Sequence, residues 1–238
     1  MNIYEIKSIE KLIKGNEYVG RGIIAGRSKD GKNAVCAYFI MGRSENSRNR
    51  IFEKDGDSLK TEPFDPSKVS DPSLIIYNAV RPFKKSLIVT NGDQTDTIFD
   101  LMSEGKSFSA ALETRAFEPD APNFTPRISA LLNLEHGFSY EMSILKSIDK
   151  DGSDCCRFTF SYPSKPGLGH FIHTYVQNGE PIPTFQGEPE RTLIPDDVDE
   201  FTSEIWKNLD ESNKISLYVR YTDIESGKYT DRLLNKNN

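Results

Sequence analysis

The grouping of the β-rich segments limits the fold more than any other feature of this sequence. Strand-like segments come in runs, and segments with helical periodicity occur only between those runs. Residues 18–27 and 33–41 are rich in β-branched and aromatic side chains, and a short polar stretch with an Asp-Gly pair separates them as in a hairpin. A second pair, 73–83 and 86–92, is separated by only two lysines. Such runs of strands predict an α+β fold with antiparallel sheets.

Three segments have helical periodicity instead. Residues 93–105 place apolar side chains at helical spacing, with Asp93 or Thr95 as the expected N-cap. Residues 107–117 form a second expected helix. Residues 195–209 form a third, with one apolar face and acidic residues in the first turn.

The remaining segments follow from the same patterns. Residues 1–16 read as a short amphipathic element, and residues 118–126 carry three prolines and are expected to form a loop. Residues 179–195 are expected to be irregular, and the polar end from Asn235 to Asn238 to be frayed. Further strands are expected at 127–134, 138–148, 156–162 and 170–176, with a last strand at 216–224. Composition does not change along the chain, so we expect one domain over residues 1–238.

Composition excludes several classes of protein. The net charge of −6 argues against duplex nucleic acid as a partner, and no apolar run reaches the length of a membrane-spanning helix. The first residues lack the apolar core of a signal peptide, and three cysteines give no disulfide framework, so we expect a cytoplasmic protein with reduced thiols. His170 and His173 fall on opposite faces of an expected strand, which argues against a metal site.

A basic segment stands out against this acidic background. Residues 21–50 hold five of the twelve arginines and carry a net charge of +5. The richest part, GRSENSRNR at residues 42–50, directly follows an apolar strand. Arginine side chains match the geometry of phosphate and carboxylate groups, so this segment could form an anion pocket. A solvated basic loop explains the composition equally well.

Three further groups of residues could take part in chemistry. Residues 90–97 could offer backbone N–H groups to an anion at a helix start, although turn and cap roles account for most of them. Tyr77, with Asn78 and Arg81 nearby, could be an acid with a lowered pKa or a packing residue. Glu118, at the end of the second expected helix, could be functional or merely solvated.

Five motifs in one order resemble the archaeal-type IMP cyclohydrolase family. They are YVGRGIIAGR, GRSENSRNR, IIYNAVR, NGDQTDTI and FTPRISALLN, and they cover roughly residues 18–135. The resemblance implies an N-terminal-nucleophile-hydrolase-like fold, a four-layer αββα sandwich of two antiparallel sheets with outer helices. That family lacks a self-processing nucleophile, and here Met1 is followed by Asn2. Residues 1–17 precede the resemblance as an N-terminal extension, and they or the diverged C-terminal half could form a contact in a homo-oligomer.

The resemblance also implies a reaction on a purine ribonucleotide. The carboxamide nitrogen of 5-formamidoimidazole-4-carboxamide ribonucleotide attacks the formyl carbon of the same molecule, and loss of water gives IMP without a metal or organic cofactor. By resemblance, Arg50, Tyr77 and Glu118 are the catalytic candidates. The substrate-binding candidates are Arg21, Arg27, Arg43, Ser44, Asn49, Asn78, Asn91, Gly92, Thr95, Asp96, Thr125 and Arg127.

Two other functions compete with this one. The chain could be a different amide-processing enzyme that acts on a related phosphorylated ligand, because a fold does not fix a reaction. It could also be a non-catalytic module that binds a purine nucleotide. In that case the arginine pocket would remain, while Tyr77 and Glu118 would be structural.

Overall fold

Two antiparallel sheets form the framework of the protein, as predicted. The computed structural model describes residue 2 and residues 4–69 and 75–237, which contain two sheets of six and seven strands. The six-stranded sheet has the order β11-β10-β1-β2-β12-β13, and the seven-stranded sheet runs β3-β4-β5-β6-β7-β8-β9. The first sheet contains β1 (Arg21–Arg27), β2 (Asn33–Met41), β10 (Leu168–His173), β11 (Glu190–Leu193), β12 (Lys214–Asp223) and β13 (Tyr229–Asn235). The second contains β3 (Ile51–Asp55), β4 (Ser58–Glu62), β5 (Tyr77–Phe83), β6 (Ser86–Thr90), β7 (Arg127–Asn133), β8 (Ser139–Ser147) and β9 (Cys155–Pro163).

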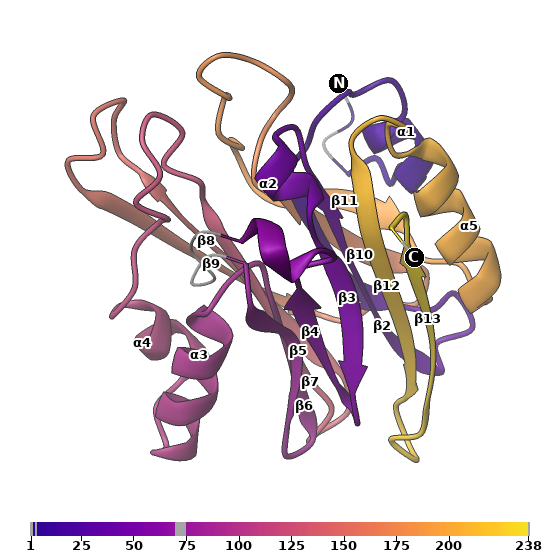
Figure 1. Cartoon of the computed structure of the whole chain (residues 1–238). Helices are drawn as coiled ribbons and strands as arrows, with labels where there is room; N and C mark the ends of the chain where they lie inside the picture. Colours follow the sequence, from indigo (N-terminus) through magenta and orange to yellow (C-terminus); the bar gives the residue numbers. More distant parts are fainter. Residues whose placement is uncertain (1, 3, 70–74, 238) are drawn as a thin grey trace.

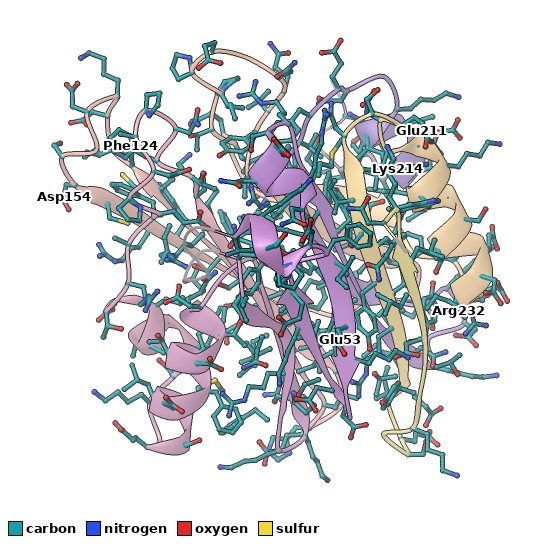
Figure 2. All side chains as sticks on the ribbon, viewed as in Figure 1. Glu53, Phe124, Asp154, Glu211, Lys214 and Arg232 are labelled. Carbon is teal, nitrogen blue, oxygen red and sulfur yellow. The ribbon has the colours of Figure 1, made fainter. Side chains whose placement is uncertain are left out.

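The sheets pack face to face through one apolar layer. Successive side chains of a strand point to opposite faces, so Ile23 of β1 faces the layer between the sheets while Ile24 faces outward. Residues of both sheets, such as Tyr38 and Tyr77, belong to the same buried cluster. Figure 2 shows how densely side chains fill the space between the sheets.

Helices cover both outer faces (Figure 1). The helices α1 (Ile9–Ile13) and α5 (Val198–Asn208) pack on the six-stranded sheet, and α3 (Gln94–Ser103) and α4 (Phe108–Leu112) pack on the seven-stranded sheet. A short helix, α2 (Glu45–Arg48), and the 3-10 turn η1 (Pro66–Lys68) lie in connections. The layer order αββα is therefore confirmed. The closer assignment to N-terminal-nucleophile hydrolases stays a prediction.

Both predicted hairpins are present. β1 and β2 pair antiparallel around a turn in which Gly31 has φ +77°, a conformation that favours glycine. β5 and β6 are joined through Lys84 and Lys85 alone, and Lys84 has φ +53°. The first two residues of the expected run 73–83 lie outside the described residues.

Four expectations from the sequence need correction. β3 and β4 were not anticipated, because each buries few apolar side chains among charged ones. β11 lies inside the stretch expected to be irregular, and β13 follows the strand expected to be last. Asn235 is not frayed: it closes β13, and its amide group bonds to the Ser216 hydroxyl and to the backbone of Phe52. Both β11 and β13 are edge strands, which carry weaker apolar patterns than central ones.

The expected helices are found, with one shortened. Ser107 caps α4 through the backbone N–H of Ala110, but the helix ends at Leu112. Glu118 therefore lies in the following loop, where its backbone N–H donates to the carbonyl of Thr125 (2.9 Å). Asp93 occupies the N-cap position of α3, yet its side chain makes no cap hydrogen bond. No helix among the described residues is long and apolar enough to cross a membrane.

Candidate active site

A cavity of about 340 Å³ lies at the end of the sandwich where β1 begins. Arg21 enters it from the first residue of β1, and Arg50 from the residue before β3. Glu118 enters from the loop between α4 and β7. The other lining residues are Tyr18, Arg43, Ser44, Asn46, Ser47, Ile75, Asp120, Asn123, Thr125, Tyr175 and Ile182. A volume of this size falls in the range of small-ligand sites, roughly 300–1,000 Å³.

Two arginines in this cavity are buried without partners for all their donors. Arg21 and Arg50 are each only 6% exposed. Within the described residues, Nε of Arg21 and both Nε and Nη1 of Arg50 are buried and make no hydrogen bond. A buried donor without an acceptor costs about 1–3 kcal/mol. The cavity is therefore prepared for a ligand that brings oxygen acceptors or negative charge.

The charge state of Arg21 and Arg50 also favours an anionic ligand in the cavity. Burial, and then the neighbouring Arg21 cation, lower the pKa of Arg50. Burial alone would lower the pKa of Arg21, but Tyr18 and Glu118 beside it raise that pKa above the ordinary value. Arginine does not lose its proton in proteins. Both side chains therefore present fixed positive charge inside the cavity.

Among the described lining residues, Glu118 is the buried carboxylate. It is also 6% exposed, and no cation within the described part of the chain comes within ion-pair distance of it. Burial raises the pKa of Glu118 above its usual value, although the charges of Arg21 and Arg127 act in the opposite direction. A carboxylate with a raised pKa is a stronger base than an ordinary one, which suits it to accept and return a proton.

Tyr77 lies in the buried layer beside the arginines. Its hydroxyl is 2.8 Å from the hydroxyl of Tyr38, which comes from the opposite sheet. Burial, followed by the Tyr77 neighbour, raises the pKa of Tyr38 well above its ordinary value. Arg21 and Arg50 act electrostatically on this pair. The three residues that the sequence resemblance marks as catalytic are therefore in one charged neighbourhood, although Tyr77 does not itself line the cavity.

The rim of the cavity is basic and polar. Arg43 lies over the ring of Tyr18, 5.3 Å from its centroid, and donates to Asn178 Oδ1 and to the carbonyl of Gly179. Ser44 begins α2 and forms a reciprocal cap with Ser47. Two of the predicted binding residues, Arg43 and Ser44, thus lie where a solvent-facing anion would enter.

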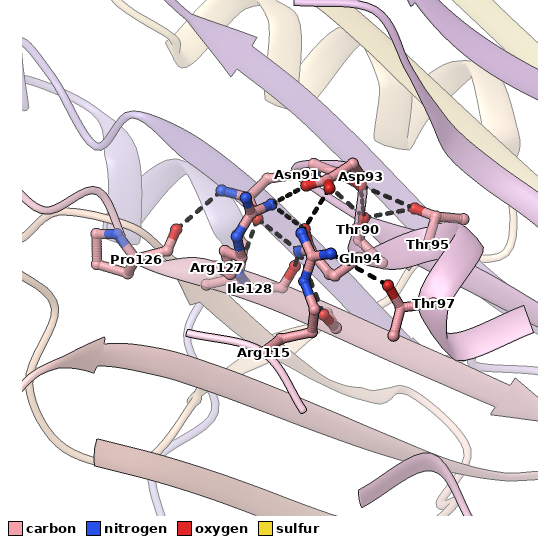
Figure 3. Close-up of polar contacts among 12 residues, drawn as sticks. Thr90, Asn91, Asp93, Gln94, Thr95, Thr97, Arg115, Pro126, Arg127 and Ile128 are labelled. Atoms are coloured by element: carbon pink, nitrogen blue, oxygen red, sulfur yellow. Dashed lines mark hydrogen bonds and ion pairs between the residues drawn. The ribbon is translucent and has the colours of Figure 1, made fainter. Parts of the chain in front are cut away.

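The segment from Thr90 to Thr97 instead forms a network of polar contacts with Arg127 (Figure 3). Asn91 accepts from the backbone N–H of Ile128 (2.8 Å) and donates to the carbonyl of Pro126 (2.9 Å). Asp93 pairs with Arg115 (2.5 Å) and Arg127 (2.6 Å). The polar groups of this segment are therefore used in holding the loop together.

Several predicted substrate-binding residues consequently act within the framework and do not line the cavity. Thr95 bonds to Thr90 at 2.6 Å, and Arg127 donates to Gln94 Oε1 at 2.7 Å. Asp96 accepts from Asn78 (2.9 Å) and Arg81 (2.6 Å). The predicted binding residues that lie in this framework, outside the cavity lining, are Asn78, Asn91, Gly92, Thr95, Asp96 and Arg127. Arg127 still contributes charge, because it acts on the ionisation of Glu118.

Two further predicted binding residues, Arg27 and Asn49, do not line the cavity either. Arg27 ends β1, about 20 Å from Arg21 for six residues of extended strand, and its Nε donates to the carbonyl of Gly31. Both arginines were binding candidates by family resemblance, but they occupy opposite ends of the sandwich. The Asn49 side chain donates to the carbonyl of Asp65 (2.9 Å) and accepts from its backbone N–H (2.7 Å), so it holds two loop segments together.

Thr125 is the predicted binding residue that connects several parts of the wall. Its hydroxyl lies 2.6 Å from the hydroxyl of Tyr175 and also bonds to the carboxylate of Asp120. The rings of Tyr175 and Tyr18 stack with centroids 5.7 Å apart. The sequence analysis did not single out Tyr18, Asp120 or Tyr175, although Tyr18 begins the motif YVGRGIIAGR.

The two histidines lie on opposite faces of β10, as expected. Nδ1 of His170 is 2.7 Å from the Tyr140 hydroxyl, whereas Nδ1 of His173 is 2.7 Å from the carbonyl of Tyr175. No group of His, Cys, Asp or Glu with metal-binding geometry occurs among the residues that the structure describes.

Comparison with known proteins shows the family to which the chain belongs. The sequence model of the family described as IMP cyclohydrolase-like protein matches residues 18–227. The chain belongs to this family. The match continues well beyond residues 18–135, the part that carries the resemblance in sequence motifs.

Archaeal relatives named IMP cyclohydrolase are similar over part of their length. The protein of Methanopyrus kandleri is 35% identical over 122 residues, which are 50% of this chain and 60% of that protein. The protein of Methanosphaera stadtmanae is 31% identical over 165 residues, 68% of this chain and 75% of that protein. That of Methanococcus aeolicus is 26% identical over 162 residues, 66% and 74% of the two chains. The alignment to the first of these thus covers less than two thirds of the relative.

Proposed function

We propose that this protein is an IMP cyclohydrolase that converts 5-formamidoimidazole-4-carboxamide ribonucleotide to IMP and water in purine biosynthesis. The observation that carries the proposal is the cavity in which Arg21 and Arg50 keep buried donors without acceptors beside the buried Glu118. Membership of the family and relatives named IMP cyclohydrolase support it.

The reaction needs little beyond positioning, proton transfer and charge stabilisation. Both reacting groups belong to one molecule, so holding them in contact removes much of the barrier. The carboxamide nitrogen forms a bond to the formyl carbon and gives up one proton, while the formyl oxygen gains a proton. The ring then loses that oxygen as water together with the proton of the former formamido nitrogen. None of these steps requires a metal or organic cofactor.

Three residues have the chemistry for these transfers. Glu118 takes the proton from the carboxamide nitrogen, because its raised pKa makes it a stronger base than an exposed glutamate. The unpartnered N–H groups of Arg50 bind the negative charge that develops on the formyl oxygen. Tyr77, in contact with Tyr38 and near both arginines but outside the cavity lining, exchanges a proton with that oxygen once the bound nucleotide reaches its hydroxyl.

The position of the charges orients the nucleotide. The 5′-phosphate lies at the basic rim with Arg43 and Ser44, and the imidazole carboxamide lies deeper, between Arg21 and Glu118. This orientation keeps the most solvated group of the ligand nearest to water. It also places the reacting atoms where water is excluded, which strengthens each electrostatic contact. We place the reaction in the cytoplasm, and a homo-oligomer stays a prediction.

The test is to mix the purified protein with the formamido nucleotide, without added metal, and to follow IMP formation by ultraviolet absorbance. IMP binding is measured in parallel by calorimetry. Turnover together with binding supports the proposal. IMP binding without turnover would indicate the nucleotide-binding module instead. Turnover of other phosphorylated amides but not of this substrate would indicate a different amide-processing enzyme.

A further inference from the structure

A second cavity, of about 330 Å³, lies at the other end of the sandwich. Three turns surround it: the turn between β3 and β4 with Asp57, the turn between β5 and β6 with Lys84 and Lys85, and the turn at 224–227 between β12 and β13. These turns are at the bottom of Figure 1, away from α2. This cavity shares no lining residue with the candidate active site.

A buried arginine points into the space between the sheets at this cavity. Arg220 of β12 is 7% exposed, and it lies on the same face of its strand as Tyr218, which belongs to the apolar layer between the sheets. Its Nε donates to Thr222 Oγ1 (3.2 Å), and its Nη1 donates to the carbonyl of Asp57 (3.2 Å). Nη2 makes no hydrogen bond within the described residues.

The guanidinium is packed against an aromatic ring and forms no ion pair among the described residues. The ring of Tyr229 stacks on it, with 3.6 Å between the Arg220 Cζ atom and the ring centroid. Among the described residues, no carboxylate forms an ion pair with it. Asp231 is occupied by Lys54 (2.6 Å) and by the Tyr218 hydroxyl (3.0 Å). A buried charge without a counter-charge is costly, so this cavity favours an anion.

The rest of the lining defines what kind of anion fits. Lys84 and Lys85, exposed at the rim, add positive charge, and the exposed carboxylates of Asp57 and Glu225 add negative charge, so these lining residues together with Arg220 carry a net charge of +1. The Asp57 carboxylate accepts from the Tyr229 hydroxyl (2.7 Å). Leu87, Leu134 and Ile224 provide an apolar wall. A planar guanidinium fork binds the oxygens of a carboxylate or a phosphate. The wall beside it suits a small apolar group attached to that oxyanion.

We infer that the Arg220 cavity is a second ligand site, which binds a small organic anion consisting of one carboxylate or phosphate group joined to an apolar body. The oxyanion binds Arg220 and Lys85, and the apolar body rests on Leu87 and Leu134. This site is independent of the proposed ring closure, so either can fail without the other.

The experiment measures the access of reagent to Lys85 in the full chain. The protein is acetylated under limiting reagent with increasing phenyl phosphate, benzoate or inorganic phosphate, and modification at each lysine is quantified by mass spectrometry. We expect phenyl phosphate or benzoate to slow acetylation of Lys85 at least threefold, at a concentration at least fivefold below that needed with inorganic phosphate. Lys106, exposed between α3 and α4, is the internal reference and should not change. The two organic probes tell a phosphate site from a carboxylate site.

An Arg220→Gln variant should lose this protection, with its fold checked by circular dichroism. If that variant does not fold, the comparison of organic with inorganic probes in the native protein still decides the matter. Equal acetylation of Lys85 with and without every probe would overturn the inference. So would protection that persists unchanged in a folded Arg220→Gln protein.

Discussion

Replacement of Arg50 by methionine should stabilise the protein while it removes activity. Methionine keeps much of the side-chain length but removes the buried cation. The two donors of Arg50 that lack acceptors, Nε and Nη1, cost about 1–3 kcal/mol each when counted separately, and the attraction of Glu118 offsets part of that. We expect a net gain of about 2 kcal/mol. For a domain of 150–250 residues this raises Tm by roughly 4–8 °C.

The same substitution should lower kcat by about 10²–10³-fold, the usual effect of removing one group that stabilises an oxyanion. Scanning calorimetry gives Tm, and the absorbance assay gives turnover. The matched control is Arg48→Met, two residues away. Arg48 is exposed, and it donates to the Gly42 carbonyl (3.1 Å) and to Asn213 Oδ1 (3.0 Å), so its loss should not raise Tm.

Stabilisation by bound IMP provides a second test of the role of Arg50. IMP at one hundred times its Kd stabilises a protein by about 2.7 kcal/mol, and this gain should shrink in Arg50→Met. A lower Tm for Arg50→Met than for Arg48→Met would refute the argument, because it would show that Arg50 is a satisfied structural residue. Unchanged kcat would remove it from the mechanism.

The remaining predictions concern proton transfer and the supporting network. Glu118→Gln should lower kcat/KM by about 10²–10⁴-fold and abolish the acidic limb of its pH profile; an unchanged limb would exclude Glu118 as the base. Because burial raises the pKa of Glu118 in the folded state, ionisation of Glu118 opposes folding. The contribution of Glu118 to stability is full below its unfolded-state pKa and is lost as pH rises through its folded-state pKa. Urea unfolding should show that loss in the native protein but not in Glu118→Gln. Tyr77→Phe should keep IMP binding by calorimetry and lose turnover, whereas Tyr38→Phe, which removes the same hydrogen bond but leaves the Tyr77 hydroxyl, should retain most turnover. Gly92→Ala places a Cβ 2.5 Å from Arg127 Nη1 and should lower the free energy of unfolding by about 1–3 kcal/mol; an unchanged urea midpoint would show that the network yields freely.

The strands could be predicted from the sequence where their apolar patterns are strong. The hairpins β1–β2 and β5–β6 could be predicted because their strands are central and rich in apolar residues; β1, β2 and β6 are almost entirely buried, and β5 is mostly so. β3 and β13 could not, because each lies at a sheet edge and has a polar, weakly alternating sequence. Edge position alone does not decide this, because β4 is paired on both sides and was missed, whereas the edge strand β9 was predicted.

The candidate site was predictable only in part, because its residues meet through tertiary packing. Arg21 and Arg27 were both candidates by family resemblance, although six residues of extended strand already separate them by about 20 Å, at opposite ends of the sandwich. Asp93 looked like a helix cap, but its carboxylate neutralises Arg115 and Arg127 from distant segments. Arg50 and Glu118 came from family resemblance, since a single sequence does not reveal that both are buried in one cavity.

The initial rate of IMP formation from the formamido nucleotide, with a metal chelator present, tests the central claim most directly. The account predicts steady turnover by the native protein that falls at least a hundredfold in Glu118→Gln. Absence of IMP formation by a folded native protein, or equal rates in the two proteins, would contradict it.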